Sequence, residues 1–111
     1  MTEKSDSIYL KHLLESINAI EEFSKDLTEK ELVHNRLKQS AIIREIEIIG
    51  EAVKNISNTL KEKHSEIMWK EIAGTRDKMI HNYFGIDFEI VWNIIKIDLP
   101  ILKKQIFSII F

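Results

Sequence analysis

The clearest hydrophobic pattern lies in the middle of the chain, over residues 35–60. Six aliphatic residues recur there at alternating steps of four and three, namely Ile42, Ile46, Ile49, Val53, Ile56 and Leu60. This spacing is typical of a helix whose seam packs on another helix. Further apolar residues lie outside the seam, at Ala41, Ile48 and Ala52. They indicate burial on more than one side, so we predict one long helix from about Asn35 to Leu60.

Gly50 lies inside this predicted helix. A glycine in a helix interior costs about 1 kcal/mol relative to alanine. That cost is reasonable where a second backbone or a neighbouring subunit comes close. We therefore expect a close approach of another segment at Gly50.

The first segment with helical periodicity runs from about Ser7 to Lys25. Its apolar residues fall mostly on one side of a helix, namely Leu10, Leu13, Leu14, Ile17, Ile20 and Phe23. Ser5, Asp6 and Ser7 are its candidate N-caps. After it, residues 26–34 predict a loop with a single helical turn.

The last helix is predicted from about Phe88 to Ile110, behind the candidate N-cap Asp87. We expect Pro100 to kink or restart it, because proline lacks a backbone donor and clashes with the preceding turn. The tail over residues 106–111 is strongly apolar. We expect this tail to dock on the domain or on a partner.

A shorter helical stretch is predicted over residues 69–82, which the pair Gly74–Thr75 is able to interrupt. Gly85 suits the left-handed position that ends a helix. Together these segments predict an all-α fold, a compact antiparallel bundle of four to five helices. The chain is expected to form a single domain over residues 1–111.

Composition narrows the class of protein. Apolar residues make up 44% and charged residues 31% of the 111 positions, which is typical of a soluble globular domain. There is no cysteine, which excludes disulfides and thiolate metal sites. The chain shows neither a signal-peptide pattern nor an apolar run near the ~20 residues of a membrane span. We therefore expect a cytoplasmic protein that does not contact the membrane.

The net charge of −2 and the pI of about 6.1 argue against a protein that coats nucleic acid with a broad basic face. They leave room for an enzyme that contacts a few phosphates through a local patch. Binding would then depend only weakly on salt, because few counterions are released.

The candidate chemistry lies in residues 76–83, which read Arg-Asp-Lys-Met-Ile-His-Asn-Tyr. Arg76, His81 and Tyr83 form the pattern R-x4-H-x-Y. Arginine binds phosphate oxygens with a planar fork of donors, and histidine exchanges a proton near neutral pH. The tyrosine hydroxyl can be a ligand or can accept a transferred group. This combination favours phosphodiester chemistry.

If residues 76–83 formed one straight helix, Arg76 and Tyr83 would share a stripe and His81 would point about 140° away from Arg76. Arg76 and His81 of one chain would then not meet at one phosphate unless the helix bends. Two copies facing each other across a twofold axis could bring both pairs into one cleft, which favours a composite site in a dimer. Asp77 lies four residues before His81, where it can orient the imidazole and favour its protonated form.

The same residues can also have purely structural roles. Arg76 can form a surface salt bridge, and His81 can contact a helix end. The other histidines, His12, His34 and His64, are expected to be ordinary surface or half-buried residues, and Trp69 and Trp92 are expected to belong to the core. Glu45, Glu47 and Glu51 alternate with isoleucines and are assigned to a solvated face. None of these clusters has the ligand spacing of a zinc site.

Several blocks outside the motif carry a resemblance to a known family. They are Tyr9-Leu10-Lys11-His12-Leu13, Glu47-Ile48-Ile49-Gly50-Glu51-Ala52, Trp69-Lys70-Glu71-Ile72-Ala73-Gly74, Val91-Trp92 and Asp98-Leu99-Pro100. With these blocks in order around R-x4-H-x-Y, the chain resembles the HepT-like family, compact members of the HEPN superfamily of all-helical nucleases. The resemblance covers nearly the whole length.

The resemblance implies a homodimeric, metal-independent endoribonuclease without a cofactor, the toxin of a type VII toxin–antitoxin pair. It implies Arg76 and His81 as catalytic residues, with Asp77 and Asn82 in supporting positions. The partner would be an MntA-like nucleotidyltransferase antitoxin that transfers AMP from ATP to Tyr83. An adenylate there would compete for the arginine by its negative charge.

Two other functions remain open. One is a noncatalytic helical subunit that binds a nucleotide or escorts a nucleotidyltransferase. The other is a helical dimerisation module without a site. The presence of both Arg76 and His81 favours the ribonuclease, because an adaptor does not need a positioned acid or base.

Overall fold

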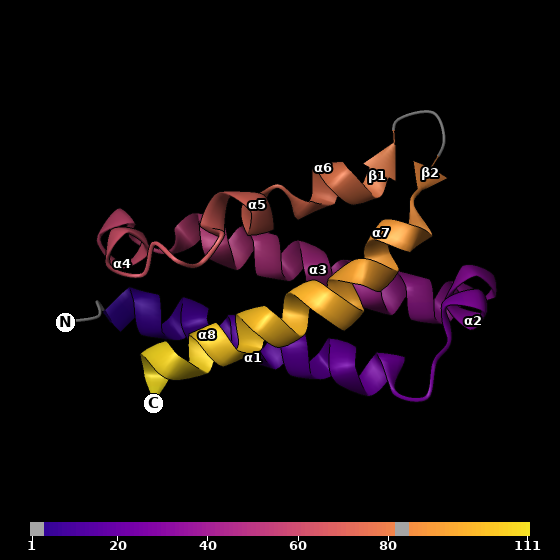
Figure 1. The fold of residues 1–111 in the computed structure, drawn as a ribbon, viewed down its shortest axis with the longest axis horizontal. Coiled ribbons are helices and arrows are strands. Elements are labelled where there is room, and N and C mark those ends of the chain that lie inside the picture. Colours follow the sequence, from indigo (N-terminus) through magenta and orange to yellow (C-terminus); the bar gives the residue numbers. More distant parts are fainter. Residues whose placement is uncertain (1–3, 82–84) are drawn as a thin grey trace.

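Two long antiparallel helices form the base of the fold (Figure 1). α1 spans Lys4–Ser24 and α3 spans Arg36–Asn55, and the two pack against each other along their lengths. The computed structural model describes residues 4–81 and 85–111. Between the long helices lies α2, Glu29–His34, which begins with a capping box. Thr28 accepts from the Glu31 backbone N–H, and Glu31 accepts in return, which explains why this weakly periodic segment forms a helix.

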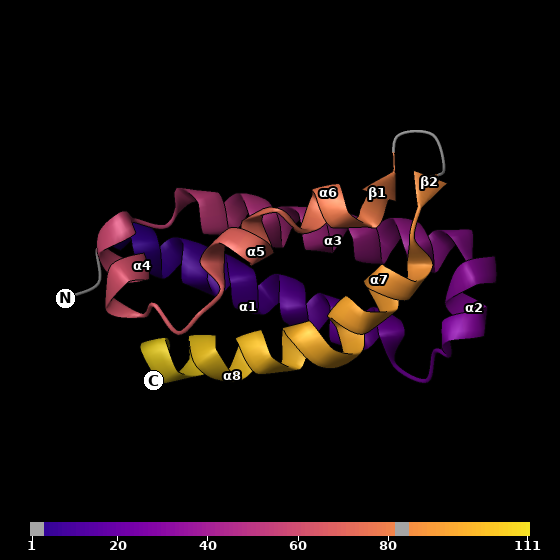
Figure 2. The same cartoon turned by 45° about the horizontal axis from the view of Figure 1, so that its top comes forward.

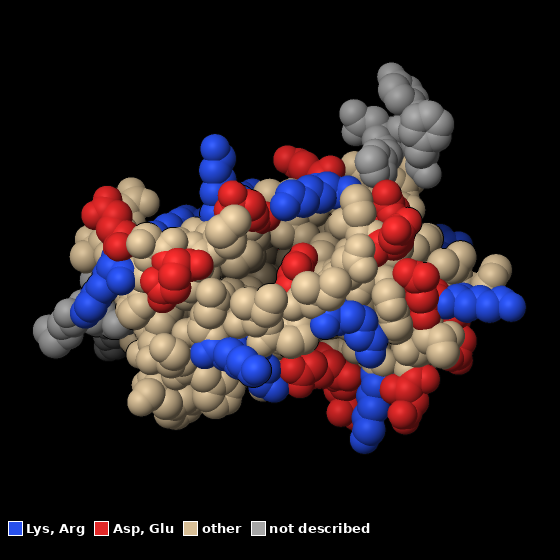
Figure 3. Space-filling model, viewed as in Figure 1, with Lys and Arg blue, Asp and Glu red and all other residues tan. Residues whose placement is uncertain are grey.

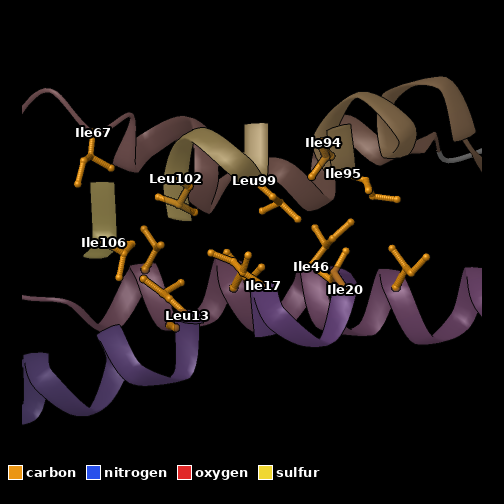
Figure 4. Close-up of a cluster of buried hydrophobic side chains, with 14 of the residues drawn as sticks. Leu13, Ile17, Ile20, Ile46, Ile67, Ile94, Ile95, Leu99, Leu102 and Ile106 are labelled. Carbon is orange, nitrogen blue, oxygen red and sulfur yellow. The ribbon is translucent and has the colours of Figure 1, made fainter. Parts of the chain in front are cut away.

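A third layer, formed by the C-terminal segment, covers α1 and α3. It consists of α7 (Phe88–Asn93), the π-helical turn η1 (Ile94–Asp98) and α8 (Leu99–Ile110), which follow one another without a break. Figures 1 and 2 show this segment lying over α1 from two directions. Between the layers lies the core, which Figure 4 shows as aliphatic side chains directed toward one another, among them Leu13, Ile17, Ile20, Ile46, Leu99, Leu102 and Ile106. The predicted all-α bundle is thus confirmed.

The predicted helix over residues 35–60 is wrong at its C-terminal end. α3 ends at Asn55, Ile56 is extended with ψ 140°, and α4 begins separately at Asn58 and runs to Lys63. The break occurs because the buried carboxylate of Asp6 accepts two hydrogen bonds from Ser57. The backbone N–H donates at 2.8 Å and the hydroxyl donates at 2.6 Å. Ile56 nevertheless remains buried, so the seam continues across the break.

The same contact corrects the expected start of the first helix. α1 already begins at Lys4, so the three candidate N-caps Ser5, Asp6 and Ser7 lie inside the helix. Asp6 is only 1% exposed, and its side chain joins α1 to the start of α4. A carboxylate so deeply buried needs hydrogen-bond donors of this kind.

The predicted interruption at Gly74 is confirmed. α5 spans Trp69–Ala73 and α6 spans Thr75–Met79. The Thr75 hydroxyl donates to the Ile72 carbonyl at 2.7 Å, which ties the two short helices together. α6 ends at Met79, three residues earlier than the predicted stretch.

Beyond α6 the chain forms a short antiparallel ladder. β1, Ile80–His81, pairs with β2, Gly85–Ile86, in the register Ile80 to Ile86 and His81 to Gly85. Gly85 has φ +79°, so its left-handed conformation is confirmed, although it begins a strand and does not end a helix. The backbone N–H of Asp87 then donates to the Met79 carbonyl at 2.8 Å. The motif segment is therefore not one straight helix, and its predicted helical geometry is wrong.

The C-terminal segment agrees with its prediction, including at Pro100. Asp87 caps α7 by accepting from the Ile90 N–H at 3.2 Å. Pro100 lies in the first turn of α8, where a missing donor costs little. The π-helical turn just before it interrupts the regular α-helix, which restarts at Leu99, so the restart expected at Pro100 is confirmed.

The apolar tail docks through one face only. Ile106 is fully buried and Ile109 and Ile110 are half-buried, whereas Phe107 and Phe111 are exposed and lie against each other with ring centroids 5.2 Å apart. Across the residues described, no helix is both long and apolar enough to pass through a bilayer.

Candidate active site

Arg76 belongs to α6, a five-residue helix that is held against the middle of α3. Two features keep it there. Met79, at the end of α6, is fully buried. Gly50 of α3 faces the backbone of α5 so closely that a methyl group placed on it would lie 3.5 Å from the Ala73 carbonyl oxygen. The close approach expected at Gly50 is confirmed, and it is made by α5 of the same chain.

This packing brings Arg76 to Glu47. The segment formed by α5 and α6 runs antiparallel to α3 (Figure 1). Glu47 lies one turn before Gly50, and Arg76 lies one turn after Ala73, so the two residues come together. The Arg76 Nε–H donates to Glu47 Oε2 at 3.1 Å. The arginine side chain is 60% exposed and the glutamate side chain 35% exposed. The pair therefore lies at the surface, with the carboxylate anchored deeper than the guanidinium.

A polar hollow of about 420 Å³ opens beside this pair. Its charged lining residues are Arg44, Glu47, Glu51, Lys54 and Arg76. Lys54 pairs with Glu51 at 3.4 Å along α3. The hollow thus contains three cations and two carboxylates, a mixture that suits a few phosphate groups better than a long polyanion. Within the described part of the chain, no cluster of acidic or histidine side chains has the arrangement of a metal site.

A second hollow of about 320 Å³ lies between α5–α6 and η1–α8 and is mainly apolar. Met68 and Ile101 line it and are 59% and 55% exposed. Ile97, one turn before Ile101, is also 55% exposed. The hollow thus brings an exposed aliphatic side chain of α8, Ile101, beside α6.

The structure tests the predicted site residues only in part. Arg76 and Asp77 both lie exposed on α6. The backbone of His81 belongs to β1, but its side chain lies outside what the structure describes, as do Asn82 and Tyr83 entirely. Convergence of Arg76 and His81 on one phosphate therefore stays a prediction.

One predicted contact loses its geometric basis. Asp77 was expected to reach His81 across one turn of a continuous helix, but α6 ends at Met79 and His81 is in a strand. Helical i,i+4 spacing therefore does not apply to this pair. The backbone of His81 is instead placed by its pairing with Gly85.

Glu47 is the residue that sequence reasoning missed, because it was assigned to a solvated face. A local signal was present, since Gly50 three positions later marked the point where another backbone approaches. Glu45 also departs from that assignment, because it accepts from the Ser16 hydroxyl of α1 at 3.2 Å. Glu51 conforms to it and is exposed.

The residues assigned to ordinary roles lie largely where expected. His12 and His34 are exposed and His64 is half-buried. Trp69 is buried, and its indole N–H donates to the His64 carbonyl at 3.0 Å. Trp92 is only half-buried, and the Lys96 ammonium lies over its ring, 4.9 Å from the ring centre. On the face shown in Figure 3, basic and acidic side chains alternate, and no continuous basic surface is visible there.

Comparison with known proteins agrees with this picture. The family model described as Ribonuclease HepT-like matches residues 13–109. A "Probable ribonuclease HepT" of Thermococcus cleftensis is 45% identical, over 93% of this chain and 94% of that protein. A "Gamma-glutamylcyclotransferase and putative RNase" of Methanocaldococcus jannaschii is 48% identical over 96% of this chain. The match spans about half of that relative, 48% of its length.

No solved structure gives a significant match. The family match covers most of the chain and includes α3, the short helices α5 and α6 and the R-x4-H-x-Y segment. The near full-length relative from Thermococcus has the same extent as this chain. The chain therefore belongs to the HepT-like family of ribonucleases.

Proposed function

We propose that this HepT-like ribonuclease is a metal-independent endoribonuclease in which Arg76 and His81 act on the RNA phosphodiester. The proposal rests on one observation, the exposure and hydrogen bonding of the Arg76 guanidinium. Its guanidinium is exposed at the edge of the polar hollow, and Nε makes its one hydrogen bond to the residues described. The two terminal amino groups remain available to phosphate oxygens.

The chemistry follows from the residue types. His81 removes the proton from a ribose 2′-hydroxyl, or donates one to the leaving 5′-oxygen. The 2′-oxygen attacks phosphorus, the bond from phosphorus to the 5′-oxygen breaks, and the 5′-oxygen receives a proton. Arg76 stabilises the charge that grows on the non-bridging oxygens. The products are a 2′,3′-cyclic phosphate and a 5′-hydroxyl.

We further propose that the active form is a homodimer of one HEPN domain per chain, with the two motifs in a shared cleft. The exposed aliphatic residues Met68 and Ile101 support this part, because they line the apolar hollow that α6 also lines. Exposed apolar patches of this kind are typical of protein–protein contacts.

The regulatory part of the proposal comes from the family resemblance. The chain would be the toxin of a type VII toxin–antitoxin pair, silenced when an MntA-like nucleotidyltransferase transfers AMP to Tyr83. In that reaction the tyrosine oxygen attacks the α-phosphorus of ATP, pyrophosphate leaves, and the tyrosine proton is released. The new phosphodiester would add a negative charge seven residues from Arg76 in the motif and compete with RNA for its guanidinium.

A chimeric substrate tests the chemistry directly. A labelled DNA strand with one ribonucleotide should be cut only at that ribonucleotide, in buffer with EDTA, and should give the cyclic phosphate. The same strand with a 2′-O-methyl group at that position should remain intact. Cleavage of the methylated strand, or loss of all activity in EDTA, would contradict the mechanism.

A further inference from the structure

Glu47 and Arg76 come from segments that are far apart in the sequence, since the two residues are 29 positions apart. Glu47 projects from the long helix α3, whose neighbouring residues Ile46 and Ile49 are buried in the core. Arg76 projects from the short helix α6. The carboxylate thus stands on a 20-residue helix that is anchored in the core, and the guanidinium stands on a helix of five residues.

The contact occupies a particular part of the guanidinium. Among the residues that the structure describes, the Arg76 side chain makes one hydrogen bond, from Nε to Glu47 Oε2. An arginine restrained at Nε keeps its planar head in one orientation and leaves both terminal amino groups free. These are the groups that bind two oxygens of one phosphate.

Stability does not account for this arrangement. The pair is exposed at 60% and 35%, and exposed ion pairs contribute little to folding. α6 is already held by the buried Met79 and by the approach of α5 to Gly50. The carboxylate also places a negative charge in a hollow that is proposed to accept RNA, so its presence weakens phosphate binding and calls for a compensating benefit.

We propose that Glu47 is the positioning residue of Arg76, holding the guanidinium at Nε so that its terminal amino groups face the scissile phosphate. This rests on the proposed ribonuclease function. Glu47 then has two opposing effects on catalytic efficiency. Its hydrogen bond raises kcat by orienting Arg76, whereas its charge raises KM by repelling the phosphate.

Two substitutions separate the hydrogen bond from the charge. Glu47→Gln keeps an oxygen that can accept from Nε but removes the charge. Glu47→Ala removes both. We expect Glu47→Ala to lower kcat by about 10–100-fold, the cost of a misplaced catalytic group, and Glu47→Gln to restore most of that loss. Both variants should have a lower KM for RNA than the parent.

Glu51 provides the matched control. It lies one turn further along α3, lines the same hollow and pairs with Lys54, not with Arg76. Glu51→Ala removes the same charge from the same hollow, so it should lower KM as Glu47→Ala does, but its kcat should stay well above that of Glu47→Ala. The double variant Glu47→Ala/Arg76→Ala should be no slower than Arg76→Ala alone, because a positioning residue acts only through the group it positions.

The outcomes separate this inference from the proposed function. If the parent cleaves RNA and Arg76→Ala does not, but Glu47→Ala keeps the parental kcat, the positioning role is wrong and the proposed function stands. A Glu47→Gln variant as slow as Glu47→Ala, or a double variant slower than Arg76→Ala, would also overturn it. A parent that does not cleave RNA would remove both proposals. Thermal unfolding of each variant, measured in parallel, identifies a loss of fold, and Glu47→Gln tests the KM effect without removing any side-chain volume.

Discussion

A methyl group on Gly50 would lie 3.5 Å from the carbonyl oxygen of Ala73, which is ordinary van der Waals contact. This relationship determines how close α5 and α6 lie to α3, and with it the distance from Arg76 to Glu47. A methyl group fits in the available space, but a longer side chain does not. The size of residue 50 is therefore linked to the geometry of the candidate site.

This gives the first prediction. Gly50→Ala should stabilise the protein by about 0.5–1 kcal/mol, because alanine favours the helix. Gly50→Leu should destabilise it by about 1–3 kcal/mol through overpacking and should also lower RNase activity as α5 and α6 shift. Urea unfolding measures both, and Ser40→Leu at an exposed position of α3 is the control. An unchanged activity in Gly50→Leu would show that the site does not depend on this contact.

The second prediction concerns the catalytic pair. Arg76→Ala and His81→Ala should each lower RNA cleavage by about 10²–10⁴-fold, the usual contribution of a charge-stabilising donor or an acid–base group. Lys78→Ala removes another exposed cation from α6 and should have a far smaller effect. Cleavage of labelled RNA with purified protein is the measurement, and a His81→Ala variant as fast as the parent would refute the assignment.

The third prediction concerns the acceptor of AMP. The chain has two tyrosines, Tyr9 and Tyr83. After incubation with the antitoxin, ATP and Mg²⁺, the parent and Tyr9→Phe should both gain the mass of AMP, and Tyr83→Phe should not. Tyr83→Phe should still cleave RNA and should arrest growth even when the antitoxin is expressed with it. Intact-mass analysis decides the point, and an increment that persists in Tyr83→Phe would place the acceptor elsewhere.

The fourth prediction concerns assembly. At micromolar concentration the protein should sediment as a dimer, and Ile101→Lys should shift it toward monomer by placing a charge in an apolar contact. Leu37→Lys is the control, because Leu37 is 79% exposed near the start of α3. The monomer produced by Ile101→Lys should be a poor ribonuclease. A fully active monomeric parent would argue against a shared cleft.

The fifth prediction concerns the buried carboxylate. Asp6→Ala leaves the Ser57 N–H without its acceptor and should destabilise the protein by about 1–3 kcal/mol. Asp6→Asn retains an acceptor oxygen and should cost less. Ser5→Ala, at the exposed neighbouring position, should be close to neutral. Chemical denaturation of the three variants gives the comparison.

Local signals in the sequence predicted much of the fold. The aliphatic seam of α3, the cap at Asp87 and the interruption at Gly74 each depend on residues within one or two turns, and each is confirmed. The break after Ile56 was not predictable in this way, because its cause is a carboxylate 51 positions from Ser57. Periodicity alone contains no information about such a distant polar partner.

The candidate site shows the same difference between local signals and contacts of distant residues. Arg76 was found because its chemistry is visible in one short motif. Its partner Glu47 was not, because the pair forms only once α5 and α6 pack on α3. The helical geometry assumed for residues 76–83 failed for a related reason. The backbone N–H of Asp87 donates a hydrogen bond to the Met79 carbonyl, and this contact requires the chain to return through β2.

The first turn of α1 and the end of α8 lie toward one end of the molecule, whereas β1 and β2 lie toward the other (Figures 1 and 2). A domain or tag joined to either end of the chain would therefore be attached far from β1 and β2. The relative from Methanocaldococcus, of which this chain matches about half, shows that such a sequence occurs within a longer polypeptide. For laboratory work, fluorescent reporters or immobilisation handles can be attached at both ends of the chain, away from β1 and β2.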